Sequence, residues 1–124
     1  MTVLTEGRHP GEFLISEANG ALSRDKVTVV VPAATTLEAG TVLGKVSATG
    51  YYAPYDSTKS DGTEVAVAIL YDNVTNEAVT PANIAAVVIN QDAEVRADDL
   101  EFGTGVDEAG ALVDLRAVGI KARD

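Results

Sequence analysis

The chain has 124 residues, of which 46% are hydrophobic but only 5% are aromatic. A chain of this length fits one domain with one core, and its many small and β-branched side chains favour a sheet. The formal net charge of −10 repels nucleic-acid phosphates and anionic lipid, so we expect neither as a partner. The absence of cysteine excludes disulfides, thiolate metal sites and thiol nucleophiles.

The N-terminal segment, residues 1–25, is rich in glycine and charge and has one short apolar cluster, Phe13 to Ile15. That cluster is too small to order the segment by itself. Two interpretations stay open: a loosely held terminus, or an arm that becomes ordered on binding, with Phe13 to Ile15 as its anchor. The segment lacks the features of a Sec-type signal, and no stretch reaches the roughly 18 apolar residues of a membrane span.

Five segments have strand patterns. Residues 41–49 alternate between two faces, which predicts a half-buried strand, and Gly44 in its middle calls for a bulge or a close backbone approach. Residues 64–71 are apolar on both faces, which predicts a central strand. The full set of predicted strands covers residues 26–31, 41–49, 51–55, 64–71 and 84–89.

One helix is predicted near the C-terminus. Asp107 is a suitable N-cap, the apolar residues of 108–118 follow a helical spacing, and Gly119 suits the position just after the helix. The acidic residues 92–101 fit either an edge strand or a short helical turn. We interpret their carboxylates as a solvated edge that discourages unwanted pairing.

The residues of known catalytic and metal-binding motifs are missing. His9 is the only histidine and has no partner at a motif spacing, so we expect it to be exposed to solvent. Lys45 follows a glycine, as in a phosphate-binding loop, but Val46 stands where such a loop needs Ser or Thr. Asp56, Asp61 and Gly62 resemble part of a calcium loop but fit a turn better. We therefore expect no catalytic residue, no metal ion and no cofactor.

Several sequence blocks occur in a recognisable order. They are Gly-Thr-Val-Leu-Gly-Lys-Val at 40–46, Ala-Thr-Gly-Tyr at 48–51, Asp-Gly at 61–62, Ala-Ile-Leu at 68–70 and Leu-Arg-Ala-Val-Gly-Ile at 115–120. In this order and spacing the chain resembles the lambda-type bacteriophage head decoration proteins, over roughly residues 36–122.

The expected fold class is α+β, mostly β. We expect a small β-rich single domain, barrel-like or β-tulip-like, over residues 26–124, with one C-terminal helix. A flexible capsid-binding arm would precede it over residues 1–25.

The resemblance implies a structural protein rather than an enzyme. It would bind as a homotrimer at local threefold axes of the expanded phage head and cement the shell against the pressure of packaged DNA. Its partner would be the major capsid protein, its location the outer surface of the virion, and its place of synthesis the host cytoplasm. The implied capsid contacts lie in the arm, at Glu12, Phe13, Leu14, Ile15, Ser16 and Glu17.

An alternative is a barrel-sandwich-type carrier or ligand-binding subunit of an enzyme. Residues 39–46 are superficially similar to the strands of biotinyl and lipoyl carrier domains. Those domains present their modified lysine at a tight hairpin tip, whereas Lys45 is predicted in the middle of a strand.

Overall fold

The computed structural model describes residues 11, 13–17, 24–103 and 105–123. These residues contain the strands β1 (Leu14–Glu17), β2 (Arg24–Val31), β3 (Thr35–Leu37), β4 (Val42–Lys45), β5 (Tyr52–Pro54), β6 (Ala66–Leu70), β7 (Val74–Asn76), β8 (Ala82–Ile89), β9 (Ala93–Arg96) and β10 (Ile120–Arg123). They also contain a 3₁₀ helix, η1 (Ala97–Asp99), and the α-helix α1 (Glu108–Ala117).

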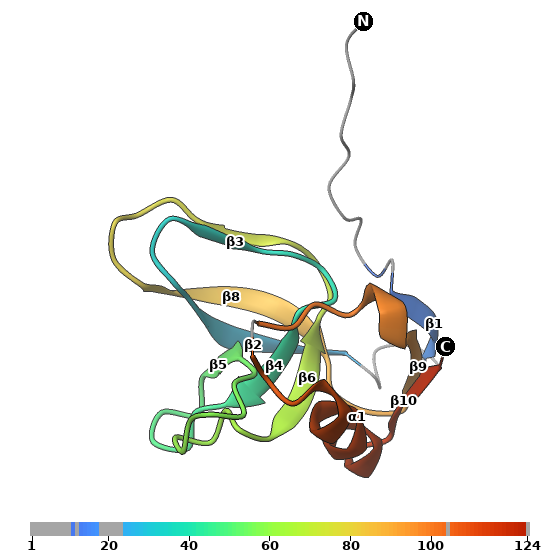
Figure 1. The fold of residues 1–124 in the computed structure, drawn as a ribbon. Coiled ribbons are helices and arrows are strands. Elements are labelled where there is room, and N and C mark those ends of the chain that lie inside the picture. The colour runs from blue at the N-terminus through green and yellow to red at the C-terminus, as the bar shows by residue number, and fades with distance from the viewer. Residues whose placement is uncertain (1–10, 12, 18–23, 104, 124) are drawn as a thin grey trace, which may run out of the picture.

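Five strands close into a barrel in the order β2, β5, β4, β6 and β8 (Figure 1). The longest ladder pairs β2 with β8 antiparallel, from Arg24 opposite Ile89 to Val31 opposite Ala82. The barrel closes where β2 and β5 meet in parallel at Val29 and Tyr52. The predicted class, a small β-rich domain with a barrel and one C-terminal helix, is confirmed.

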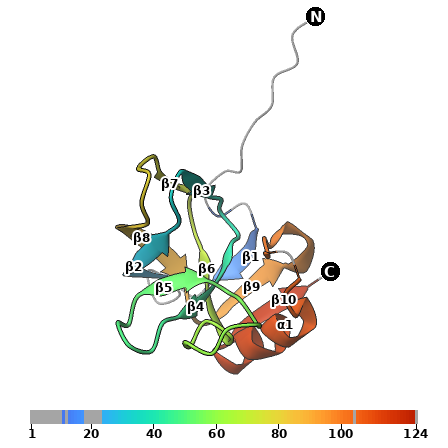
Figure 2. The ribbon, with the colours of Figure 1, turned by 60° about the vertical axis from the view of Figure 1, so that its left-hand side comes forward.

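Two smaller sheets accompany the barrel. In one, β9 lies between β1, which is antiparallel to it, and β10, which is parallel to it. This sheet lies with α1 on one side of the barrel (Figure 2). In the other, β3 pairs with β7. Residues 32–37 and 74–81, which we call the lobe, extend away from α1 in Figure 1.

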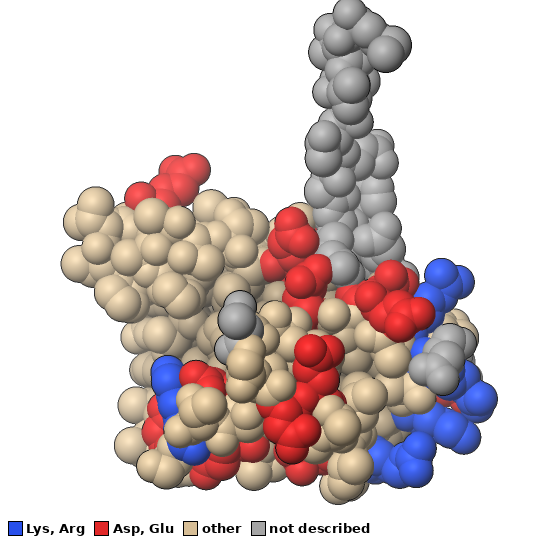
Figure 3. Space-filling view, in the orientation of Figure 1, with Lys and Arg blue, Asp and Glu red and all other residues tan. Residues whose placement is uncertain are grey.

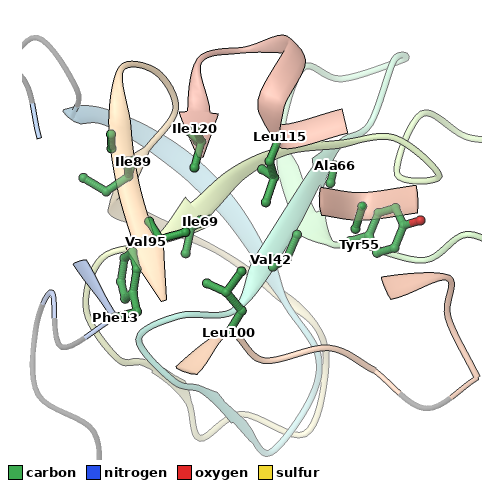
Figure 4. Packing of buried hydrophobic residues seen from close by; sticks show 12 residues of the cluster. Phe13, Val42, Tyr55, Ala66, Ile69, Ile89, Val95, Leu100, Leu115 and Ile120 are labelled. Carbon is green, nitrogen blue, oxygen red and sulfur yellow. The ribbon is translucent and has the colours of Figure 1, made fainter. Parts of the chain in front are cut away.

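The buried side chains form two cores, and the strands β4 and β6 and the end of β8 contribute to both. The barrel core draws side chains from all five barrel strands, among them Leu43 and Leu70. The outer core packs α1 and the small sheet against the barrel, with Val42 and Ile69 on its barrel side (Figure 4). Successive side chains of a strand point to opposite faces, so β4 and β6 each contribute to both cores.

The prediction for residues 41–49 is wrong in two respects. The strand ends at Lys45, because the chain turns back at once: Val46 N–H donates to the Tyr51 carbonyl at 2.8 Å, and Gly50 N–H donates to the Val46 carbonyl at 2.8 Å. The strand is also buried on both faces rather than on one, since the two cores cover opposite sides of it. The predicted strands at 26–31, 51–55, 64–71 and 84–89 are confirmed as β2, β5, β6 and β8.

The predicted helix is confirmed. The Asp107 carboxylate accepts from Gly110 N–H at 3.0 Å as the N-cap, and Gly119 has a φ of 88° just after the helix. The buried Tyr55 hydroxyl donates to the Asp107 carbonyl oxygen at 3.0 Å, which ties the barrel to the start of α1. Burial raises the pKa of Tyr55, as does the nearby Asp107, so its hydroxyl stays a neutral donor at physiological pH.

Residues 92–101 contain both of the alternatives left open by the sequence. The strand β9 comes first and the 3₁₀ helix η1 follows it directly. However, β9 is the middle strand of its sheet, so its interpretation as an edge is wrong. Its acidic side chain Glu94 is only partly exposed, and it accepts from Arg123 on β10 at 3.0 Å.

Gly44 has both of the features that were predicted as alternatives, a bulge and a close approach to another backbone segment. The β4–β6 register shifts between Leu43 and Gly44, as at a bulge. A Cβ on Gly44 would lie 2.5 Å from Thr63 Cα, which leaves no room for a side chain.

We predict that Gly44→Ala lowers the free energy of unfolding by about 1–3 kcal/mol, because the added methyl overlaps the Thr63 backbone. Gly103→Ala is the matched control: the nearest atom to its Cβ, Val106 Cγ1, is 3.9 Å away, so we expect a change within about 0.5 kcal/mol. Urea unfolding measures both values, and equal stabilities of the two variants would contradict the close approach.

Candidate binding surface

The described residues contain no group of three or more His, Cys, Asp or Glu side chains that could hold a metal ion. Within the same residues, no helix is long and apolar enough to cross a membrane. The single histidine, His9, lies outside the described residues.

The two aspartates that resembled part of a calcium loop are engaged in turns. The Asp61 carboxylate accepts from the side chain and backbone of Thr63 at 2.6 and 3.1 Å, and these bonds lower the pKa of Asp61. The hydroxyl and amide of Thr58 lower the pKa of Asp56 in the same way. These contacts match the interpretation of the loop as turns.

Phe13, the first residue of the predicted arm anchor, is fully buried in the outer core. Figure 4 shows its ring beside Val95 of β9. Backbone bonds hold the chain on both sides of it: Arg96 N–H donates to the Phe13 carbonyl and Gly11 N–H donates to the Tyr71 carbonyl, each at 2.8 Å. Phe13 thus belongs to the packed domain and presents no surface to a partner.

The residues after Phe13 form β1 at the edge of the small sheet. Leu14 pairs with Val95 and packs partly against the outer core, whereas the side chain of Ile15 is 45% exposed. The register shifts between Leu14 and Ser16. One edge of β1 faces β9, and among the residues that the structure describes no strand pairs with its other edge, which is the arrangement that accepts a further strand.

The remaining predicted contacts are only partly visible. Ser16 and Glu17 lie opposite Glu94 and Ala93 in the ladder, but their side chains are outside the described residues, as is all of Glu12. The boundary between arm and domain at residue 25 stays a prediction. In the part of the predicted arm that the structure describes, Phe13 and β1 pack with the domain.

A polar hollow of about 410 Å³ opens beside β1 and is lined by Ile15, Arg96, Asp98 and Asp99. The fold thus brings the exposed Ile15 next to two acidic residues far away in the sequence. Arg96 also lines the hollow, so its rim carries both positive and negative side chains.

Basic side chains gather near this end of the molecule, at Arg96, Arg116, Lys121 and Arg123 of β9, α1 and β10. Figure 3 shows most of the visible Lys and Arg side chains on the right, whereas acidic side chains lie mainly over the middle and lower part of the visible face. The Arg123–Glu94 pair raises the pKa of Arg123, but both partners are solvent-accessible, so it stabilises the fold little. The β1 end therefore differs in charge from the otherwise acidic surface.

A sequence model of a protein family, described as bacteriophage lambda head decoration protein D, matches residues 3–120. The chain belongs to this family. The match reaches residue 3, well before the start of the resemblance at residue 36, so it includes β1 and most of the preceding segment. A comparison with curated proteins gives no match.

Membership of this family gives the chain a role in decorating the phage head. It implies association with the capsid and a place in the virion. The family is a structural one and not a known enzyme family.

We predict that Phe13→Ala lowers the free energy of unfolding by about 3–5 kcal/mol, since it removes a fully buried ring. Ile15→Ala, two residues further along in β1, should cost about 1 kcal/mol or less because the side chain is largely exposed. Thermal and urea unfolding of the two variants test this difference. A Phe13→Ala variant as stable as the wild type would show that the N-terminal segment is not part of the packed domain.

Proposed function

We propose that the chain binds as a homotrimer at local threefold axes of the expanded phage head and cements the shell against the pressure of packaged DNA. The observation that carries this proposal is the family match over residues 3–120. Mechanical reinforcement needs surfaces rather than a reaction centre. That requirement agrees with a barrel in which Asp56 and Asp61 accept hydrogen bonds in turns and Glu94 pairs with Arg123.

The capsid-binding surface in this proposal is the unpaired edge of β1 together with the residues before it. A strand of the capsid protein, or the N-terminal segment laid along a capsid sheet, would gain main-chain hydrogen bonds by β-augmentation. Ile15 would add an exposed apolar contact. Phe13 would act indirectly, since its burial fixes where the segment leaves the domain.

Three such segments in one trimer would bind cooperatively. Each segment pays an ordering cost on binding, so a single attachment is weak. Once one is attached, the other two bind as if intramolecular, and avidity can exceed a single affinity by about a hundredfold or more when the geometry allows it. Expansion of the shell would create that geometry, which makes binding dependent on head maturation.

The carrier alternative requires a lysine at a hairpin tip. Lys45 is the last residue of β4 rather than a mid-strand residue, but it pairs with Tyr52, and the turn lies beyond it. Its ammonium lies 5.8 Å from the centre of the Tyr52 ring. Since the lysine lies beside the neighbouring strand and not at the tip, no observation favours the carrier over the decoration protein.

We predict that deletion of residues 1–10 leaves stability and self-association unchanged but weakens binding to expanded, undecorated heads by about tenfold or more, since avidity multiplies the loss in each segment. Co-sedimentation with the heads measures the binding, and melting of the variant is the control for folding. Undiminished binding would remove these residues from the mechanism. Deletion of residues 1–17 is a poorer test because it also removes Phe13 and β1 from the domain.

A further inference from the structure

The lobe is almost free of charge in a strongly acidic chain. Residues 27–37 contain no charged side chain, and residues 73–91 contain only Glu77, although the chain has 19 acidic residues. The lobe forms a nearly uncharged surface at the upper left of Figure 3. This part of the molecule can approach another acidic surface with little electrostatic repulsion.

The loop after β7 is held firmly by a buried side chain. The Asn76 amide donates to the carbonyls of Val31 at 3.0 Å and Thr80 at 2.9 Å, and its oxygen accepts from Ala78 N–H at 2.9 Å. The Ala78 carbonyl in turn accepts from Ala34 N–H at 2.9 Å. These bonds fix the loop before any partner arrives, which lowers the entropic cost of binding through it.

This braced loop carries Val79, which is 91% exposed. By comparison, Val113 on α1 is 70% exposed and Val65 is 46% exposed. An exposed apolar side chain on a loop that is already ordered is suited to enter an apolar hollow on a partner.

A suitable hollow lies at the base of the same lobe. It has a volume of about 390 Å³, and its apolar lining comes from the end of β2, from β5, from Pro81 just before β8 and from the loop before α1. Its main apolar residues are Val30, Pro32, Pro54, Pro81 and Val106. The volume is ample for one valine side chain.

The charges around these two features are complementary. Glu77, the one charged residue of the lobe, lies two residues before Val79, and Lys59 lines the hollow. Asp56 also lines the hollow, and the hydrogen bonds that it accepts from Thr58 lower the pKa of its carboxyl, so it stays ionised there. The charge on the hollow that is complementary to Glu77 is therefore that of Lys59 alone. A chain with Val79 in a neighbour's hollow would therefore bring Glu77 toward the neighbour's Lys59.

We propose that a second copy of this chain is the partner: Val79 of one copy enters the hollow of the next, with Glu77 directed to Lys59. This inference rests on the homotrimer of the proposed function and names the surface that forms it. Because loop and hollow are different surfaces, the contact is heterologous, and repetition of it can close into a threefold ring. The lobe, whose one charged residue is Glu77, lets three chains of net charge −10 meet without opposing their acidic faces.

The test compares Val79→Glu with Val113→Glu by sedimentation velocity and light scattering. Both valines are exposed, so both variants should melt like the wild type. We expect Val79→Glu to weaken self-association by about tenfold or more, because a charge would have to enter an apolar hollow, whereas Val113→Glu should remain trimeric.

The ion pair has its own test. Glu77→Lys and Lys59→Glu should each weaken self-association, and the chain with both changes should recover much of it, since the pair is restored with the charges exchanged. The double variant remaining as weak as the single variants would overturn the pairing of these residues.

The outcomes separate this inference from the proposed function. A wild-type chain that is monomeric at every concentration tested contradicts the homotrimer and this contact with it. A wild-type trimer together with an equally stable Val79→Glu trimer overturns only the contact. Loss of the trimer in Val79→Glu but not in Val113→Glu supports it.

Discussion

The burial of β4 and β6 on both faces is the constraint on which the rest of this structure depends. Leu43 and Leu70 fill the barrel, while Val42 and Ile69 support the outer layer of α1 and the small sheet. Neither layer can be removed without exposing the other side of the same strands. Gly44 makes this possible, since the strand must pass against the Thr63 backbone with no side chain in between.

Because β4 and β6 support the outer layer, they also support the strand β1 at its edge. The outer layer supplies β9, and β9 supplies the ladder on which β1 forms. Phe13 closes the outer core and so fixes the start of β1 in the domain. In the proposed function, the residues before Phe13 would reach the capsid from this point, and the lobe would be available for contacts between copies.

Local sequence signals predicted the elements whose pattern is complete within a few residues. The apolar run of β8, the doubly apolar β6 and the capped helix α1 are of this kind. The glycine at position 44 was also informative, because its cost in a strand needs a structural reason. The family resemblance rests on sequence blocks between residues 40 and 70 and at 115–120. The family match extends it to residue 3.

The features that were missed depend on pairing between distant segments. The strands β3, β7 and β10 have only three or four residues each and no pattern of their own. Phe13 looked like an anchor for a partner because its local surroundings are polar, yet Val95 and Ile120, far along the chain, complete its core. The sequence of the lobe has one distinctive feature, the near absence of charge over residues 73–91. The structure is needed to show that Val79 in this stretch is almost fully exposed.

Cryo-electron microscopy of expanded heads saturated with this protein tests the central claim most directly. The account predicts three copies around each local threefold axis, with β1 and the N-terminal segment on the shell and the lobes in contact with neighbouring copies. Isolated single copies, or copies whose β1 edge points away from the shell, would contradict it.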